Sequence, residues 1–265
     1  MRKPLPVFRR AIADSWRSII GWTIGVVGVL FMYLPLFPSL GGAEMEQMIA
    51  SLPEEMVKTL GYEQIGTGAG YTQGTFFGLI GFLLLTIAAT SWGSAAIAGA
   101  EESGRLELNL AHGVSRVQYA LESALAVLVR LLWLGAVATL IVLALNEPSE
   151  LGLEPAHIVA ATAALIGLTM LSAAFALAVG ALTGRRSIAT AAGAGVAVLG
   201  YVFNAIANQS EDAEALRAVS PYSWAYQNTP LIDGADWGGL GLLWGLAVVL
   251  VVISALALRR RDITG

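Results

Sequence analysis

Six long apolar segments decide what this chain can fold into. A transmembrane helix needs about 20 mostly apolar residues, because about 30 Å of hydrocarbon is crossed at 1.5 Å per residue. The six segments are continuously apolar, whereas the strands of a membrane barrel alternate apolar and polar side chains over about ten residues. The sequence therefore predicts an all-α integral membrane protein with six transmembrane helices, over residues 18–37, 74–97, 124–145, 157–183, 187–207 and 237–258.

The composition agrees with the bilayer as the solvent. Hydrophobic residues make up 56% of the 265 residues and charged residues 13%, against about 25% charged residues in a soluble domain. The chain has no cysteine, which excludes a disulfide framework, a thiolate metal site and a cysteine nucleophile. Its two histidines, His112 and His157, are predicted on opposite sides of the membrane, so we expect no metal site.

The basic side chains predict the orientation. Twelve of the 15 lysines and arginines fall in the N-terminus, the loop after span two, the 185–186 turn and the 259–261 tail, which share one side of the membrane. Thirteen of the 19 acidic residues fall in the opposite loops. By the positive-inside rule, both termini are cytoplasmic. The first apolar segment is longer than the 7–15 residues of a signal-peptide core, so we expect it to be retained, with residues 1–265 forming a single transmembrane domain.

An amphipathic pattern precedes the first span. Leu5, Phe8, Ile12 and Trp16 recur at helical spacing, with arginines between them. This pattern predicts a basic interfacial helix that lies among the lipids of the cytoplasmic headgroup layer. The alternative is an unstructured lead-in that only fixes the topology.

Apolar residues also keep helical spacing after span one, which predicts amphipathic outer helices there. One interpretation is an outer gate, because methionine adapts to varied apolar ligands. The other is a helical hairpin that only packs on the outer ends of the spans. The candidate gate residues are Met45, Met48, Ile49, Leu52 and Met56.

The loop predicted between spans two and three, residues 98–123, is the most informative segment. A charged cluster, with Glu101 and Glu102 at its start, is followed by a short apolar segment that predicts a helix ended by Gly113, through Leu106, Leu108, Leu110, Ala111 and Val114. A short helix between two spans can act as a lever, because whatever binds it moves both spans. A polar turn with incidental leucines is the alternative. The segment reads E-E-x-G-x-L-E-L-x-L-A-x-x-V-S-R, through Glu101, Glu102, Gly104, Leu106, Glu107, Leu108, Leu110, Ala111, Val114, Ser115 and Arg116.

This segment resembles the cytoplasmic coupling segment of permeases in type-2 ATP-binding-cassette (ABC) exporters, which commonly reads E-x-G-T-L-E-x-L-L-x-x-P-V-S-R. The chain departs from that pattern at Arg105, Asn109 and Gly113. The six spans, the N-terminal helix, the Ser220-Pro221-Tyr222 segment and the arginine-rich tail also resemble the family.

The resemblance implies a permease subunit that is not itself an enzyme. The chain contains no G-x-x-x-x-G-K-[ST] phosphate loop, so ATP and Mg would be bound by a separate cytoplasmic ABC ATPase, and this chain would bind no cofactor. A second permease copy or a homologous permease would complete the transporter. The implied location is a prokaryotic plasma membrane, and no nucleic acid is expected as a partner. For so apolar a permease, we expect a lipophilic or amphiphilic substrate that is moved out of the cytoplasm.

The resemblance also assigns roles within the coupling segment. We expect its charged residues to pair with the ATPase and its leucines to fill a groove there, with Gly104 and Arg116 as further coupling residues. The charged set is Glu101, Glu102, Arg105 and Glu107, and the leucines are Leu106, Leu108 and Leu110.

Two other functions are alternatives to transport. An intramembrane protease with an E-E-x-x-x-R-like motif would use Glu101, Glu102 and Arg105, but the spacing is one residue short and the histidines are too far apart to share a metal. A membrane assembly protein without transport is the second alternative, and a stoichiometric ATPase partner would exclude it.

Two polar residues within spans are candidates for a translocation path. Arg130 is the one strong charge inside a predicted span, where an unpaired charge is costly. It either extends to the interface or serves a function, by pairing with Glu122 or by lining a polar path. Asn204 either lines a cavity or hydrogen-bonds a neighbouring helix.

Overall fold

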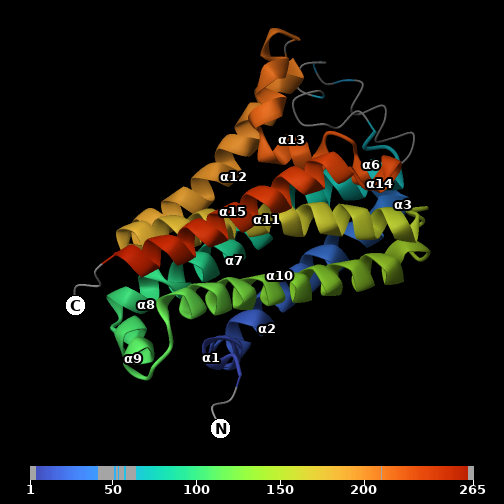
Figure 1. The fold of residues 1–265 in the computed structure, drawn as a ribbon. Helices are drawn as coiled ribbons and strands as arrows, with labels where there is room; N and C mark the ends of the chain where they lie inside the picture. Colours follow the sequence, from blue (N-terminus) through green and yellow to red (C-terminus); the bar gives the residue numbers. More distant parts are fainter. Residues whose placement is uncertain are drawn as a thin grey trace.

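The computed structural model describes residues 4–40, 51, 53, 57, 64–209 and 211–261, and over these residues the secondary structure is entirely helical (Figure 1). Six helical segments are long and apolar enough to cross a membrane. The predicted all-α architecture with six spans is therefore confirmed. The spans run over Trp16–Leu40, Gly68–Ala96, Arg116–Asn146, Pro155–Thr183, Arg186–Gln209 and Trp237–Arg260.

Four of the spans are single helices, and the first two are composite. Span one consists of α2 (Trp16–Tyr33), η1 (Leu34–Leu36) and α3 (Phe37–Leu40). Span two consists of α6 (Gly68–Thr72), the π-helical η2 (Gln73–Ile80) and α7 (Gly81–Ala96). The remaining spans are α10 (Arg116–Asn146), α11 (Pro155–Thr183), α12 (Arg186–Gln209) and α15 (Trp237–Arg260).

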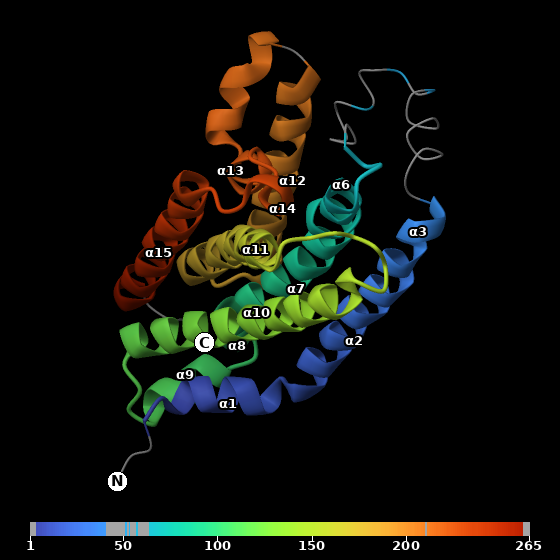
Figure 2. The same cartoon turned by 90° about the vertical axis from the view of Figure 1, so that its right-hand side faces the viewer.

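Short helices flank the spans at both ends of the bundle. At one end lie α1 (Pro6–Asp14), α8 (Ala98–Glu102) and α9 (Arg105–Ala111), beside the end of α15 (Figures 1 and 2). Toward the other end lie η3 (Glu211–Val219), α13 (Pro221–Tyr226) and α14 (Pro230–Asp233). The predicted coupling loop 98–123 thus holds α8, α9 and the beginning of α10. The third span starts earlier than predicted, because polar residues continue the helix beyond the apolar run.

Helix α11 forms the centre of the bundle, in contact with α7, α10, α12 and α15 (Figure 2). Of its most apolar window, 83% is buried. Small residues permit this close packing. A Cβ atom added at Gly93 of α7 would lie 2.7 Å from the Ala173 carbonyl oxygen of α11, and one at Gly193 of α12 would lie 2.7 Å from that of Ser172. Large apolar side chains such as Ile24, Leu140 and Val248 are exposed on the outside, as lipid contact requires.

The Ser220-Pro221-Tyr222 segment fixes α13 between two spans. The Ser220 hydroxyl donates to the Gly200 carbonyl at 2.7 Å, and the Tyr222 hydroxyl donates to the Gly78 carbonyl at 2.8 Å. Gly78 lies within the π-helical stretch, where the regular i to i−4 ladder is interrupted. The segment therefore links span two with span five.

The predicted outer gate cannot be placed in this fold. Its candidate residues Met45, Met48, Ile49, Leu52 and Met56 lie outside the described residues.

Candidate functional site

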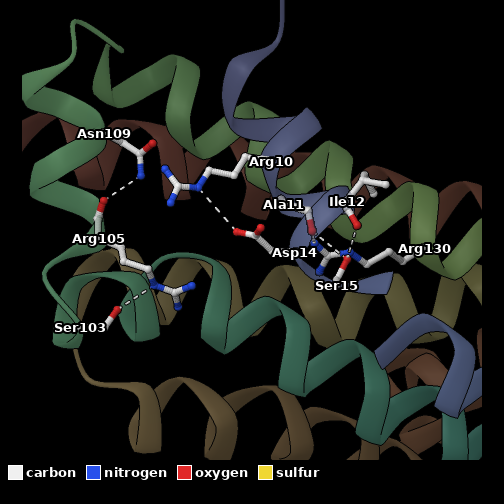
Figure 3. Close-up of polar contacts among 9 residues, drawn as sticks. All are labelled: Arg10, Ala11, Ile12, Asp14, Ser15, Ser103, Arg105, Asn109 and Arg130. Carbon is white, nitrogen blue, oxygen red and sulfur yellow. Dashed lines mark hydrogen bonds and ion pairs between the residues drawn. The ribbon is translucent and has the colours of Figure 1, made fainter. Parts of the chain in front are cut away.

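The candidate coupling site is the helical pair α8 and α9, which projects from one end of the bundle (Figure 1). A tight turn at Ser103 and Gly104 separates the two helices. Gly104 has a φ of 68°, a left-handed conformation that favours glycine. The Ser103 hydroxyl donates to the Gly99 carbonyl at 2.8 Å and accepts from Nε of Arg105 at 3.0 Å (Figure 3). The turn is thus closed by side-chain hydrogen bonds.

The inner face of α9 rests on a second apolar core. Leu106 is fully buried, in a cluster with Val7 of α1, Tyr119 of α10 and Leu258 of α15. The Tyr119 hydroxyl also donates to the Ala96 carbonyl at the end of α7, at 3.1 Å. This core joins α9 to α1, α10, α11 and α15.

An ion pair ties α8 to the end of α15. The guanidinium of Arg261 bonds the carboxylate of Glu101, and the two side chains are only 22% and 13% exposed. Gly184, which has a φ of 67°, lies directly against this pair. A Cβ atom there would lie 2.7 Å from Oε1 of Glu101 and 2.9 Å from Nη1 of Arg261, so glycine is needed both for its conformation and for space.

Two further charged side chains of this segment bind backbone groups at helix ends. Oε1 of Glu102 accepts from the backbone N–H of Arg186, the first residue of α12, at 2.7 Å. The guanidinium of Arg116 donates to the Arg261 carbonyl at 2.7 Å and to the Arg259 carbonyl at 3.4 Å, at the end of α15. An anion at a helix N-terminus and a cation at a C-terminus are both favourable. The coupling segment is therefore joined to α12 and α15 as well as to α7 and α10.

The outer face of α9 remains open. Leu108 is 62% exposed, and Arg105 is exposed beside it. Asn109 donates to the Arg105 carbonyl at 2.7 Å, which stabilises the helix from its solvent side (Figure 3). This combination gives a short helix with a fixed inner face and a free outer face.

Arg130 is buried where α1, α7 and α10 meet. Its side chain is 7% exposed, and Nη2 donates to the Ala11 carbonyl at 2.7 Å (Figure 3). The guanidinium also lies 5.5 Å from the Trp92 ring centroid. Glu122 binds elsewhere, accepting from the backbone N–H of Phe8 at 2.9 Å.

The match to known families decides the class of this protein. The family model described as ABC-2 family transporter protein matches residues 5–263. The chain belongs to the ABC-2 transporter family. It is a multi-pass membrane permease of a family that generally pairs with an ABC ATPase subunit. A search of curated proteins finds no match.

The predicted coupling residues of the permease separate into two groups. Glu101, Glu102, Leu106 and Arg116 face other parts of the same chain, and Gly104 forms the turn. Arg105 and Leu108 point outward, and Glu107 and Leu110 are half-buried between the two groups. The expectation that all three leucines fill a partner's groove does not fit, because Leu106 is enclosed by this chain. The contacts with an ATPase stay a prediction.

The internal partners of the coupling segment are not predicted by the sequence patterns. Arg186, Gly184 and Arg261 come from distant parts of the chain, and the arginines served only to predict orientation. A usable signal was present, because arginine clusters and the acidic cluster of residues 101–107 were assigned to the same side of the membrane.

The structure does not pair Arg130 with Glu122, because its guanidinium donates to the Ala11 carbonyl and lies beside Trp92. Its extension to the interface and its place in a translocation path stay predictions. Oδ1 of Asn204 accepts from the Ser223 hydroxyl of α13 at 2.9 Å, which agrees with its interpretation as an interhelical contact.

Proposed function

We propose that this permease exports a lipophilic or amphiphilic compound from the cytoplasm, driven by ATP that a separate ABC ATPase hydrolyses. The ATPase docks on α9. The transporter contains a second copy of this permease or a homologous one, in a prokaryotic plasma membrane. ATP and Mg are bound by the ATPase, and this chain contributes only the pathway and the coupling helix.

The orientation rests on charge. The basic N-terminus, the coupling segment, the 185–186 turn and the end of α15 belong to one end of the bundle. The positive-inside rule makes this end cytoplasmic, where an ATPase has access to it.

The observation that carries the proposal is the two-sided construction of α9. Its outer face presents Leu108 with Arg105, an apolar contact next to a charge. Its inner face is fixed through Leu106, and the segments on either side bind α12 and α15. A partner that moves α9 therefore moves spans rather than a loose loop.

The substrate class rests on the bundle's apolar surfaces. An open apolar groove of about 470 Å³ runs along α10, α11 and α15, and its lining residues Leu140 and Val159 are 66% and 56% exposed. Its lining includes Leu132, Leu140, Ile166 and Trp244, and the hydroxyls of Thr139 and Thr162 bond each other at 2.8 Å. Such a surface favours an apolar ligand over a charged one.

The docking helix is tested by isolating the tagged permease from its native membrane and quantifying the ATPase that accompanies it. We expect Leu108→Glu to lower the retained ATPase by about tenfold, as for a central contact of an interface. Val219→Glu is the matched control, because Val219 is 58% exposed, close to the 62% of Leu108, but lies on η3 toward the other end. Wild-type permease without any ATPase would refute the proposal and favour the assembly protein.

A further inference from the structure

The interfacial helix α1 is held at both ends by charged side chains of α10. At its beginning, the backbone N–H of Phe8, the third residue of the helix, donates to Oε2 of Glu122 at 2.9 Å. Toward its end, the Ala11 carbonyl accepts from Nη2 of Arg130 at 2.7 Å (Figure 3). The first N–H groups and the last carbonyls of a helix have no backbone partner within it. Glu122 satisfies the N–H of Phe8, and Arg130 shares the Ala11 carbonyl with the Ser15 hydroxyl, which donates to it at 2.7 Å.

The signs of the two charges match the helix. A carboxylate stabilises the partial positive charge at a helix N-terminus, and a cation stabilises the partial negative charge at a C-terminus. Glu122 and Arg130 stand in this order on α10, next to the corresponding ends of α1. Exchanging the two side chains would oppose the helix dipole at both ends.

Both side chains are enclosed, which strengthens their contacts. Glu122 is 3% exposed and Arg130 is 7% exposed. Oε1 of Glu122 also accepts from Nε2 of Gln118 at 2.7 Å. Because a buried charge that loses a partner is destabilised, the departure of α1 from α10 costs free energy at both side chains, although Glu122 keeps its hydrogen bond from Gln118.

The same junction reaches the first two spans. Trp92 of α7, which lies against Arg130, donates from Nε1 to the Ser18 hydroxyl of α2 at 3.1 Å. Only Ser15 separates α1 from α2, and its hydroxyl donates to the same Ala11 carbonyl at 2.7 Å. A displacement of α1 therefore enters span one directly.

We propose that Glu122 and Arg130 are positioning residues that clamp α1 to α10, so that both helices move as one body. Since α10 follows α9, the clamp passes a displacement of the coupling helix through α1 into span one. The transmission step rests on the proposed function, whereas the clamp itself does not. Helix α1 accordingly transmits movement between α10 and span one, in addition to anchoring the chain in the headgroup layer.

The clamp is tested by a distance measurement, for which the chain is suited because it has no cysteine of its own. Spin labels are attached to Ala13→Cys on α1 and Leu125→Cys on α10, both exposed positions, in the permease–ATPase complex in lipid nanodiscs. The test variant is the exchange Glu122→Arg with Arg130→Glu, which keeps composition and net charge. We expect one narrow distance distribution before the exchange, and after it a broad distribution with about tenfold more undocked α1.

The matched control lies on the outer face of the same helix. Arg10 and Asp14 form an ion pair at 3.6 Å, with side chains 69% and 61% exposed (Figure 3). Their exchange, Arg10→Glu with Asp14→Arg, should leave the distribution unchanged, because exposed pairs contribute little. If the clamp exchange prevents folding, Arg130→Met is used alone. It removes only the contact with the Ala11 carbonyl, and we expect the distance distribution to broaden in the same way but by a smaller amount. An unchanged distribution in the folded exchange variant or in Arg130→Met would overturn the clamp.

Transport of a fluorescent lipophilic dye by the same complex, reconstituted into closed liposomes, tests the second half of the inference. The clamp exchange should lower ATP-driven transport by about tenfold, while the ATPase stays bound, because α9 is untouched. A broadened distribution with undiminished transport would refute the transmission step and leave the clamp in place. If the wild-type permease, without the exchange, bound no ATPase, that result would instead contradict the proposed function.

Discussion

Around the middle of α11, the permease is packed by glycines, alanines and backbone atoms, whereas at the end that carries α8 and α9 it is joined by charged side chains. Gly93 and Gly193 bring α7 and α12 within contact distance of backbone carbonyls of α11. At the other region, Glu101, Glu102 and Arg116 bind an arginine side chain, a backbone N–H and backbone carbonyls.

The difference follows from the two solvents. In hydrocarbon, helices gain little from burying apolar surface and associate through close packing. At the end of the bundle, charged side chains can pair with one another and with the N–H and C=O groups of helix ends. The packed region is therefore sensitive to added volume, and the region of α8 and α9 is sensitive to changes of charge.

The largest effect is expected from Gly193→Val, which breaks the packed region. The added Cβ would lie 2.7 Å from the Ser172 carbonyl oxygen and 2.8 Å from the Thr90 methyl carbon. We expect a loss of about 3 kcal/mol or more, since backbone atoms cannot move aside cheaply. Thermal denaturation of the purified permease measures it. Gly195→Val on the same helix is the control, because nothing lies within 4 Å of a Cβ there. Equal melting temperatures for Gly193→Val and Gly195→Val would contradict the close packing of α12 against α11.

The next effect is expected from Arg261→Glu in the charged region. The substitution places a second carboxylate against Glu101, whose side chain is only 13% exposed. We expect a loss of about 2 kcal/mol, below the range for fully buried pairs because water still reaches this one. Adding Glu101→Arg restores opposite charges and should recover most of the melting temperature. A double variant no better than Arg261→Glu alone would show that the pair is incidental.

A smaller effect is expected from Glu102→Gln. The amide oxygen can still accept from the Arg186 N–H, so only the charge at the beginning of α12 is lost. Exposed charges at helix ends contribute about 0.5 kcal/mol, and the melting temperature should fall slightly, and less in high salt. A loss as large as that of Arg261→Glu would mean that Glu102 has a structural role beyond the helix end.

The smallest effect on stability is expected from Leu108→Ser. The side chain is 62% exposed, so the free energy of unfolding should change by less than about 0.5 kcal/mol. The binding of the ATPase should nonetheless fall. A strong destabilisation of the isolated permease would show that Leu108 supports the fold and is not free for a partner.

The spans could be predicted from sequence because hydrocarbon leaves no other solution for long apolar segments. The helix of residues 105–111 could also be predicted, from the apolar residues that precede Gly113 and from the resemblance of the segment. The role of Leu106 could not, because spacing does not say which leucine faces the chain's own core.

Arg130 shows why partners are harder to predict than elements. A buried arginine needs an acceptor, and Glu122, eight residues away on the same helix, was the obvious candidate. The acceptor is instead the Ala11 carbonyl, 119 positions away, and Arg261 meets Glu101 across 160 positions. A backbone carbonyl at a helix end leaves no mark in the sequence, so only the fold reveals it.

The most direct test of docking on α9 is a single-thiol crosslink. The chain contains no cysteine, so Leu108→Cys carries one thiol, and a short crosslinker should join it to the ATPase in native membranes. Leu106→Cys, on the enclosed face of α9, and Val219→Cys, toward the other end, are the controls. The account predicts an ATPase adduct with Leu108→Cys alone. Equal adducts from all three positions, or none from Leu108→Cys while the ATPase is bound, would contradict it.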